Sequence, residues 1–174
     1  MTSAGTREDL ELFRRQSAEL GFEPELITCS RWLTYPHATP APGVGTLVYW
    51  TPRHPHTSSV DGTTAAELAE DYERATGQPW LQPLGLAHAL FEVAAHALDS
   101  ADPAEPRTIA GALAATRLDT IAGTLDWTSG PVPNVATVAL AGGRWQASGA
   151  RGCALQIVTN RRCPEVPLDA ETAR

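Results

Sequence analysis

The stretch REDLELFRRQSAELGFEPELIT, residues 7–28, decides the expected fold. Apolar or small side chains recur at helical spacing over residues 7–20, at Leu10, Phe13, Ser17 and Leu20. Gly21 favours the end of that helix, and residues 26–28 have the composition of a short strand. Because a helix, a glycine and a short strand in this order are typical of the crossover in a parallel sheet, the sequence predicts an α/β protein.

The rest of the chain continues the alternation of strands and helices. A β-branched and aromatic run predicts a buried strand over residues 46–50. Thr64 and Glu67 form a capping box that begins a helix, and Gly77 ends it. The next helix, residues 84–98, is apolar nearly all round, so we expect the core to enclose it.

Three further elements complete the expected order. Pro106 begins a helix over residues 106–115. Alternating apolar positions predict a strand over residues 121–127. Residues 134–147, divided by Gly142 and Gly143, read as a β-hairpin.

Length and charge limit the class of protein. A chain of 174 residues is expected to fold as a single domain, residues 1–174, with a real hydrophobic core. Its net charge of −7 leaves no basic footprint for nucleic acid or an anionic membrane surface. The N-terminus has no basic start followed by an apolar run, so the chain as written is expected to stay in the cytoplasm.

The three cysteines, Cys29, Cys153 and Cys163, lack the C-x-x-C spacing of zinc or redox motifs. Buried free thiols are the default interpretation. Cys153 and Cys163 flank an apolar run and a polar turn, so a disulfide between them in an oxidising compartment is the alternative.

Histidines give two candidate constellations. His54 and His56 straddle Pro55, and in an extended segment both side chains point to one side, which suits a metal site with Asp61 as a third ligand. The loop lacks longer metallohydrolase patterns, so no metal and no cofactor are expected there.

His88, Glu92 and His96 form the second constellation, since i, i+4 and i+8 share one helical stripe. The default interpretation is a polar edge hydrogen-bonded to neighbouring backbone. A binding role for His88, near the helix start, and a metal site are the alternatives.

No enzyme class is positively indicated. The chain has no G-x-S-x-G nucleophile elbow, and Gly43 and Gly45 are not followed by a glycine at position 48. Trp50 and Trp80 stand at element ends beside polar loops, where open α/β sheets hold ligands. The other tryptophans are expected to serve core or hairpin packing: Trp32, Trp127 and Trp145.

Four segments carry a resemblance to a known family. They are FRRQSAELGFEPELIT (13–28), TLVYWTPRHPHTSSVDGTTAAELAEDYERATGQPW (46–80), QPLGLAHALFEVAAHALDSA (82–101) and TIAGTLDWTSGPVPNVATVALAGGRWQ (120–146). In order and spacing they resemble the C-terminal portion of type I periplasmic solute-binding proteins of the branched-chain amino acid (Leu/Ile/Val-binding) branch of ABC transporters.

The resemblance implies a three-layer parallel-sheet lobe of that fold, apparently truncated, which binds a small polar solute such as an amino acid in a cleft between lobes and catalyses nothing. The partners it implies are the solute, a membrane permease for a full-length protein, and a second copy through the incomplete lobe. Family members are exported. A metal-dependent enzyme using His54 and His56, and a self-associating interaction protein without a transport role, are the alternatives.

Candidate ligand-binding residues follow the family only loosely. They are Tyr49, Trp50, His54, Trp80, Gln82 and His88. The family often has Tyr and Asp near the start of the corresponding helix, where this chain has Ala87 and His88. That departure weakens the expectation of an amino acid as the solute.

Overall fold

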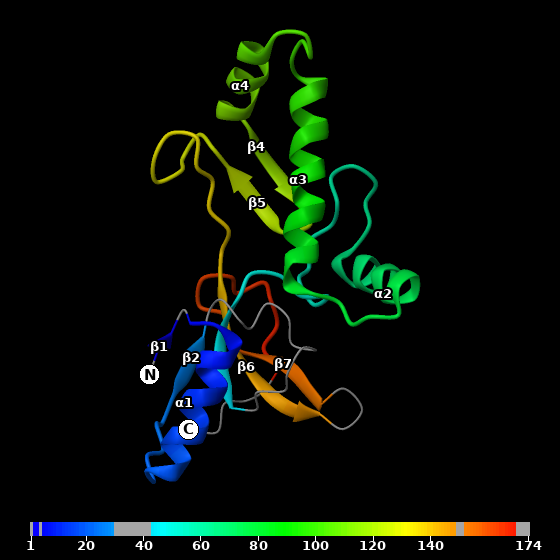
Figure 1. Ribbon diagram of the computed structural model, residues 1–174. Coiled ribbons are helices and arrows are strands. Elements are labelled where there is room, and N and C mark those ends of the chain that lie inside the picture. The colour runs from blue at the N-terminus through cyan, green and yellow to red at the C-terminus, as the bar shows by residue number, and fades with distance from the viewer. Residues whose placement is uncertain (1, 4, 30–42, 149–151, 170–174) are drawn as a thin grey trace. The chain divides into compact units, whose positions relative to one another are not determined.

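The computed structural model describes residues 2–3, 5–29, 43–148 and 152–169 (Figure 1). By their contacts the residues divide into two compact units. Unit 1 comprises Met1–Val48 and Leu140–Arg174, and unit 2 comprises Tyr49–Ala139. The chain therefore leaves unit 1 after Val48 and returns to it at Leu140.

Unit 1 is a five-stranded sheet with one described helix. Its elements are β1 (Thr2–Ser3), α1 (Arg7–Glu19), β2 (Ile27–Cys29), β3 (Val44–Val48), β6 (Ala141–Ser148) and β7 (Gly152–Thr159). The strand order is β1-β2-β3-β6-β7. β1, β2 and β3 are parallel, whereas β6 and β7 each pair antiparallel with the preceding strand of that order. The α/β prediction is confirmed, and the sheet is mixed.

The core of unit 1 lies where α1 meets the sheet. Leu10 of α1 packs with Val44 and Trp145. The expectation that Trp145 packs in the core or a hairpin is therefore confirmed. A second cluster contains Val48, Ala141, Ile157, Cys163 and Val166. Leu20 was expected on the buried face of the helix but is 82% exposed, because α1 ends at Glu19 and Leu20 is only its C-cap. Trp32 lies outside the described residues.

Cys163 is a free, buried thiol. Burial is the main cause that raises its pKa, and the charge of Glu165 adds to it. This environment agrees with the default interpretation of a packed cysteine. The side chain of Cys153 lies outside the described part of the chain.

The hairpin expected over residues 134–147 is wrong in position. Gly142 and Gly143 lie inside β6, and the hairpin is formed by β6 with β7. A Cβ on Gly142 would stand 2.5 Å from Thr159 Cγ2, and one on Gly143 2.5 Å from Val48 Cγ2. The two glycines are therefore required by close strand packing at a β-bulge rather than by a turn.

Unit 2 contains α2 (Ala65–Thr76), α3 (Gln82–Asp99), α4 (Pro106–Ala114) and a two-stranded hairpin of β4 (Arg117–Thr120) and β5 (Gly123–Asp126). The predicted capping box of α2 is present, and Gly77 ends the helix with a φ of 67°. Pro106 begins α4 as expected. The strand expected over residues 121–127 is confirmed as β5, which begins only at Gly123 because Ile121 and Ala122 form the turn after β4.

The helix α3 differs from its sequence-based description. One face is buried, with Gly85, Ala89, Val93 and Ala97 among its residues. The opposite side is not enclosed, since Leu90 is 70% and Phe91 77% exposed. The expectation that the core surrounds this helix is therefore wrong. Apolar composition predicted burial, but unit 2 provides only α2, α4 and a short hairpin to cover it (Figure 1).

The apolar core of unit 2 forms around Trp50, which is fully buried. It packs with Ala65 and Ala69 of α2, Ala89 of α3, and the buried turn residues Ile121 and Ala122. Trp127, expected to serve core or hairpin packing, is half-buried just after β5. No described helix of the protein is long and apolar enough to cross a membrane.

We expect Gly85→Ala to destabilise the protein by about 3 kcal/mol. A Cβ at Gly85 would lie 2.1 Å from Trp50 Cδ1, and both groups are held by the core. Gly111→Ala in α4 is the matched control, because a Cβ there meets nothing within 4 Å. That substitution should stabilise by about 1 kcal/mol, from helix propensity alone. Urea unfolding followed by circular dichroism measures both, and equal stabilities of the two variants would contradict the packing of Trp50 on Gly85.

Candidate functional site

All six candidate ligand-binding residues fall in unit 2. Tyr49 follows β3 directly, and its backbone N–H donates to Oε1 of Gln82 at 3.1 Å. Gln82 is the first residue of α3 and only 1% exposed. Within unit 2, this hydrogen bond therefore joins the first residue of the unit to the start of α3, 33 residues further along the chain.

Two tryptophans lie beside this junction. The Trp50 and Trp80 rings meet edge to face, with centroids 6.1 Å apart and planes at 79°. Trp80 is half-buried, and its backbone N–H donates to Oε1 of Glu73 at 3.2 Å. Nε1 of Trp50 is buried and has no hydrogen-bond partner within the described part of the molecule. Tyr49, Trp50, Trp80 and Gln82 thus form one cluster at the N-terminal end of α3.

His54 closes the turn that follows this cluster. Its Nδ1 accepts the backbone N–H of Thr51 at 2.9 Å and lies 3.1 Å from Thr51 Oγ1. The side chain is buried. Because Nδ1 accepts, the neutral ring carries its proton on Nε2. The observed contacts assign His54 a role in ordering the loop.

The suggested metal site does not assemble among the described residues. The ring centroids of His54 and His56 are 6.2 Å apart, and His56 stands beside Gly123 of the β4–β5 hairpin. Asp61 instead accepts the backbone N–H of Thr63. That hydrogen bond is the main cause that lowers the pKa of Asp61. Across the described ranges, no group of three or more His, Cys, Asp and Glu residues could hold a metal ion.

Glu92 is the buried charge around which unit 2 is arranged. Its side chain is fully buried on α3. Oε2 accepts the backbone N–H of Ser59 at 2.5 Å and its hydroxyl at 2.7 Å, and Oε1 accepts the N–H of Ile121 at 3.0 Å. The default interpretation of the His88, Glu92 and His96 stripe, a polar edge bonded to neighbouring backbone, is therefore confirmed for Glu92.

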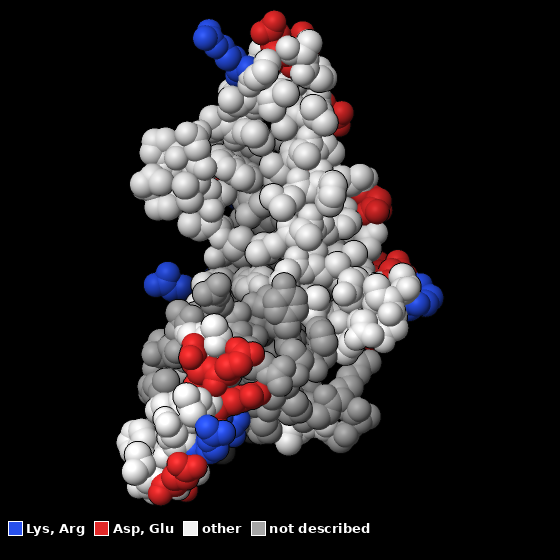
Figure 2. Space-filling view, in the orientation of Figure 1, with Lys and Arg blue, Asp and Glu red and all other residues white. Residues whose placement is uncertain are grey.

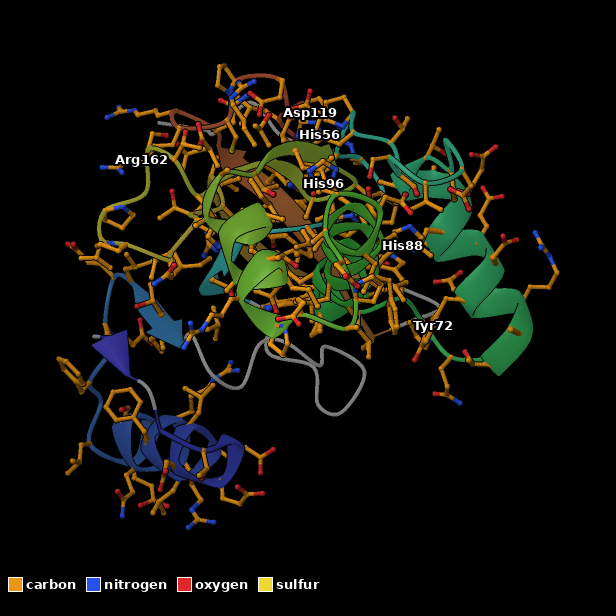
Figure 3. The ribbon with its side chains drawn as sticks, turned by 90° about the horizontal axis from the view of Figure 1, so that it is seen from above. His56, Tyr72, His88, His96, Asp119 and Arg162 are labelled. Carbon is orange, nitrogen blue, oxygen red and sulfur yellow. The ribbon has the colours of Figure 1, made fainter. Side chains whose placement is uncertain are left out.

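His88 is one turn earlier on the same side of α3, and Figure 3 looks roughly along this helix with His88 and His96 labelled on it. Its side chain is 24% exposed, and Nε2 lies 3.9 Å from Glu92 Oε1. That nitrogen is buried and makes no hydrogen bond within the described residues. A buried polar atom without a partner is a reason to look for a ligand nearby.

The N-terminus of α3 is also unusual for this protein. α1 and α2 both begin with complete capping boxes, Thr6 with Asp9 and Thr64 with Glu67. In contrast, the N-cap of α3 is Leu81, which makes no side-chain hydrogen bond to the helix. Pro83 has no backbone N–H, however, and the N–H of Leu84 donates to the Leu81 carbonyl at 3.0 Å, so the missing side-chain cap does not by itself make this helix start an anion site.

We expect Glu92→Gln to destabilise the protein by about 2–3 kcal/mol. An amide can accept on only one atom, so its nitrogen would face either the Ser59 or the Ile121 N–H. Glu67→Gln is the matched control, since exposed Glu67 also accepts a backbone N–H and a hydroxyl, and glutamine can replace it in a capping box. Thermal unfolding compares the variants. A Glu92→Gln protein as stable as Glu67→Gln would contradict the anchoring role.

Among solved structures, this chain is similar in fold to solute-binding proteins of ABC transporters. A leucine binding protein from Thermotoga maritima matches 92% of this chain and 43% of its own length, with a TM-score of 0.64 and 15% identity. An ABC-type branched-chain amino acid transporter protein from Rhodopseudomonas palustris matches 91% and 41%, with a TM-score of 0.60 and 12% identity. A solute-binding protein of the same organism, in complex with benzoate, matches 90% and 39%, with a TM-score of 0.55 and 14% identity.

These neighbours define the class of fold, that of the type I periplasmic binding proteins, which here are substrate-binding components of ABC transporters and not enzymes. Within that class, the predicted resemblance to the C-terminal portion of a leucine-type binding protein is confirmed as a fold. The chain spans less than half the length of each neighbour. No protein-family model matches the sequence, and neither does any curated protein.

Proposed function

We propose that this chain supplies part of the solute site of an ABC transporter substrate-binding protein and catalyses no reaction. The observation that carries the proposal is the fold match over 92% of the chain to a leucine binding protein. The solute is a small molecule with a carboxylate, such as an amino acid. Leucine and benzoate, the ligands named for two neighbours, share that group.

The proposed contacts lie at the N-terminal end of α3. Two features there suit a carboxylate with an apolar body. Nε2 of His88 is buried, lies 3.9 Å from Glu92 Oε1 and makes no hydrogen bond within the described residues, and the ring of Trp80 is half-buried. Trp50, Gln82 and Tyr49 position this end through packing and the Tyr49–Gln82 hydrogen bond. In the proposal His54 orders the adjoining loop and does not touch the solute.

The further partners belong to the same proposal. A membrane permease receives the solute from the protein when the whole fold is present, and copies of the chain associate through surfaces that the partial fold leaves uncovered. Family members work outside the cytoplasm, whereas a cytoplasmic location of the chain as written stays a prediction. The alternative of a metal-dependent enzyme has little support, because the described residues offer no three-ligand group.

The test is a solute titration followed by tryptophan fluorescence and by NMR of the indole N–H groups. Leucine, isoleucine, valine and benzoate are the probes. We expect at least one to shift the Trp80 signal with an affinity weaker than micromolar, because the chain covers only 43% of a whole binding protein. Micromolar binding would contradict a partial site. If none of the four solutes changes the tryptophan fluorescence or the indole N–H signals at tens of millimolar, the proposed function is overturned.

Trp80→Ala should weaken that binding about tenfold, the equivalent of about 1.4 kcal/mol. Trp127→Ala is the control, because Trp127 is also a half-buried tryptophan of unit 2 but lies beyond β5. Its removal should leave the affinity unchanged. Equal affinities of the two variants would remove Trp80 from the site. Trp50 is unsuitable for this test, since a fully buried tryptophan replaced by alanine costs about 3–5 kcal/mol in stability.

A further inference from the structure

The buried carboxylate of Glu92 has room for one more hydrogen bond. A carboxylate offers about four acceptor sites on its two oxygens. On Glu92, Oε2 accepts the N–H and the hydroxyl of Ser59, and Oε1 accepts the N–H of Ile121. One site on Oε1 therefore remains open in the part of the chain that the structure describes.

The imidazole of His88 stands beside this open site. Its Nε2 lies 3.9 Å from Glu92 Oε1, is buried, and makes no hydrogen bond within the described residues. A hydrogen bond needs a separation of about 2.7–3.2 Å, so a shift of roughly 1 Å would close the gap. The two residues are one helical turn apart on α3, so an adjustment of the side chains alone can supply this shift.

We propose that His88 is a pH-operated switch, in which a proton taken up by the ring closes Nε2–H onto the open acceptor site of Glu92. In the neutral ring only one nitrogen carries a proton, whereas in the charged ring both do, so Nε2 is then always a donor. A hydrogen bond between charged groups is also roughly twice as strong as one between neutral groups. Histidine ordinarily changes its charge between about pH 5 and 8, and the switch works in that range.

The charged groups around His88 favour the protonated ring. Besides Glu92 on α3, Asp61 in the loop before α2 senses it: hydrogen bonds from Thr63 and Ser58 are the main causes that lower the pKa of Asp61, and the charge of His88 adds to them. Figure 2 shows no Lys or Arg over α3 on the visible face and acidic groups at its edge, so no cation there opposes a charge on His88.

Other ionisable groups on the neighbouring elements are engaged elsewhere or screened. Arg53, in the loop after β3, and Glu70, on α2, are exposed, so solvent and salt screen them. On α2 and the β4–β5 hairpin, Glu67, Asp71, Glu73 and Asp119 instead bind Thr64, Arg74, Trp80 and Thr124 respectively. Glu92 and Asp61 are therefore the groups that set the response of His88.

The switch acts on the whole junction that Glu92 holds together. Glu92 ties the loop at Ser59 and the β4–β5 turn at Ile121 to α3, so a fourth hydrogen bond strengthens the attachment of both. The added stability is present where His88 is charged and is lost as the pH rises and the ring gives up its proton. The inference goes beyond the proposed function and does not depend on it, because a charged ring still offers Nδ1–H to a solute.

NMR of the solute-free chain between about pH 5 and 8 tests the proposal. The ring nitrogens of His88 report its charge, and the amide signals of Ser59 and Ile121 report the junction. We expect both amide signals to shift at the midpoint of the His88 titration, and His88→Gln to abolish the shift. His96→Gln is the matched control, because His96 is also four residues from Glu92 on α3 but has no ion pair among the described residues. It should leave the shift in place.

Urea unfolding near the two ends of that pH range is the second measurement. The gain in the folding equilibrium constant on going from high to low pH should be about tenfold larger for the unmodified chain than for His88→Gln. His96→Gln should behave like the unmodified chain. Amide signals that do not follow the His88 titration would overturn the proposal, and so would a pH response that His88→Gln leaves unchanged or that His96→Gln removes equally.

Discussion

The organisation of unit 2 depends on one buried carboxylate. Glu92 accepts hydrogen bonds from Ser59 in the loop after β3 and from Ile121 in the β4–β5 turn, while its own backbone belongs to α3. An ionised carboxylate loses much hydration when buried and is tolerated only where donors replace the water. Three donors do so here, and they hold together segments that are about 30 residues distant in sequence.

Apolar packing around Trp50 also holds together segments of unit 2 that are distant in the sequence. The indole lies against Gly85, where any side chain would collide, and it contacts residues of α2, α3 and the hairpin turn. Trp80 meets it edge to face, and Tyr49 is bound to Gln82. The N-terminal end of α3 is thus held by several contacts, yet the buried Nε2 of His88 makes no hydrogen bond within the described residues. Rigid surroundings with a few unsatisfied polar groups are typical of ligand sites.

The limited length of the chain explains why one apolar face of α3 is buried while the opposite face is exposed to solvent. The chain spans 43% of a leucine binding protein, and unit 2 has three helices but only a two-stranded hairpin among its described residues. Helices of α/β proteins bury their apolar stripes on sheets. With so little sheet available, one face of α3 is buried by its neighbours in unit 2 and the opposite face, with Leu90 and Phe91, remains exposed. The fold thus links the proposed binding role and the proposed self-association.

The sequence by itself determined the features that depend on neighbouring residues. The boundaries of α2 at Thr64 and Gly77, the start of α4 at Pro106 and the strands β2 and β3 follow from capping, turn and periodicity rules that act over a few residues. The order of these elements was also sufficient to indicate the fold class. The candidate residues Tyr49, Trp50, Trp80 and Gln82 could be named for the same reason, since they stand at element ends.

Tertiary structure alone decided which surfaces are buried and which polar groups are paired. Gly142 and Gly143 resemble turn glycines until Thr159 and Val48 approach them across the sheet. The apolar composition of α3 predicts a helix that is buried on all sides, but whether each face is covered depends on segments distant in the chain. Glu92 looks like a polar edge, and only the approach of Ser59 and Ile121 makes it an anchor. Local sequence sets backbone preference, whereas burial and hydrogen-bond satisfaction are properties of contacts that form after the chain has folded.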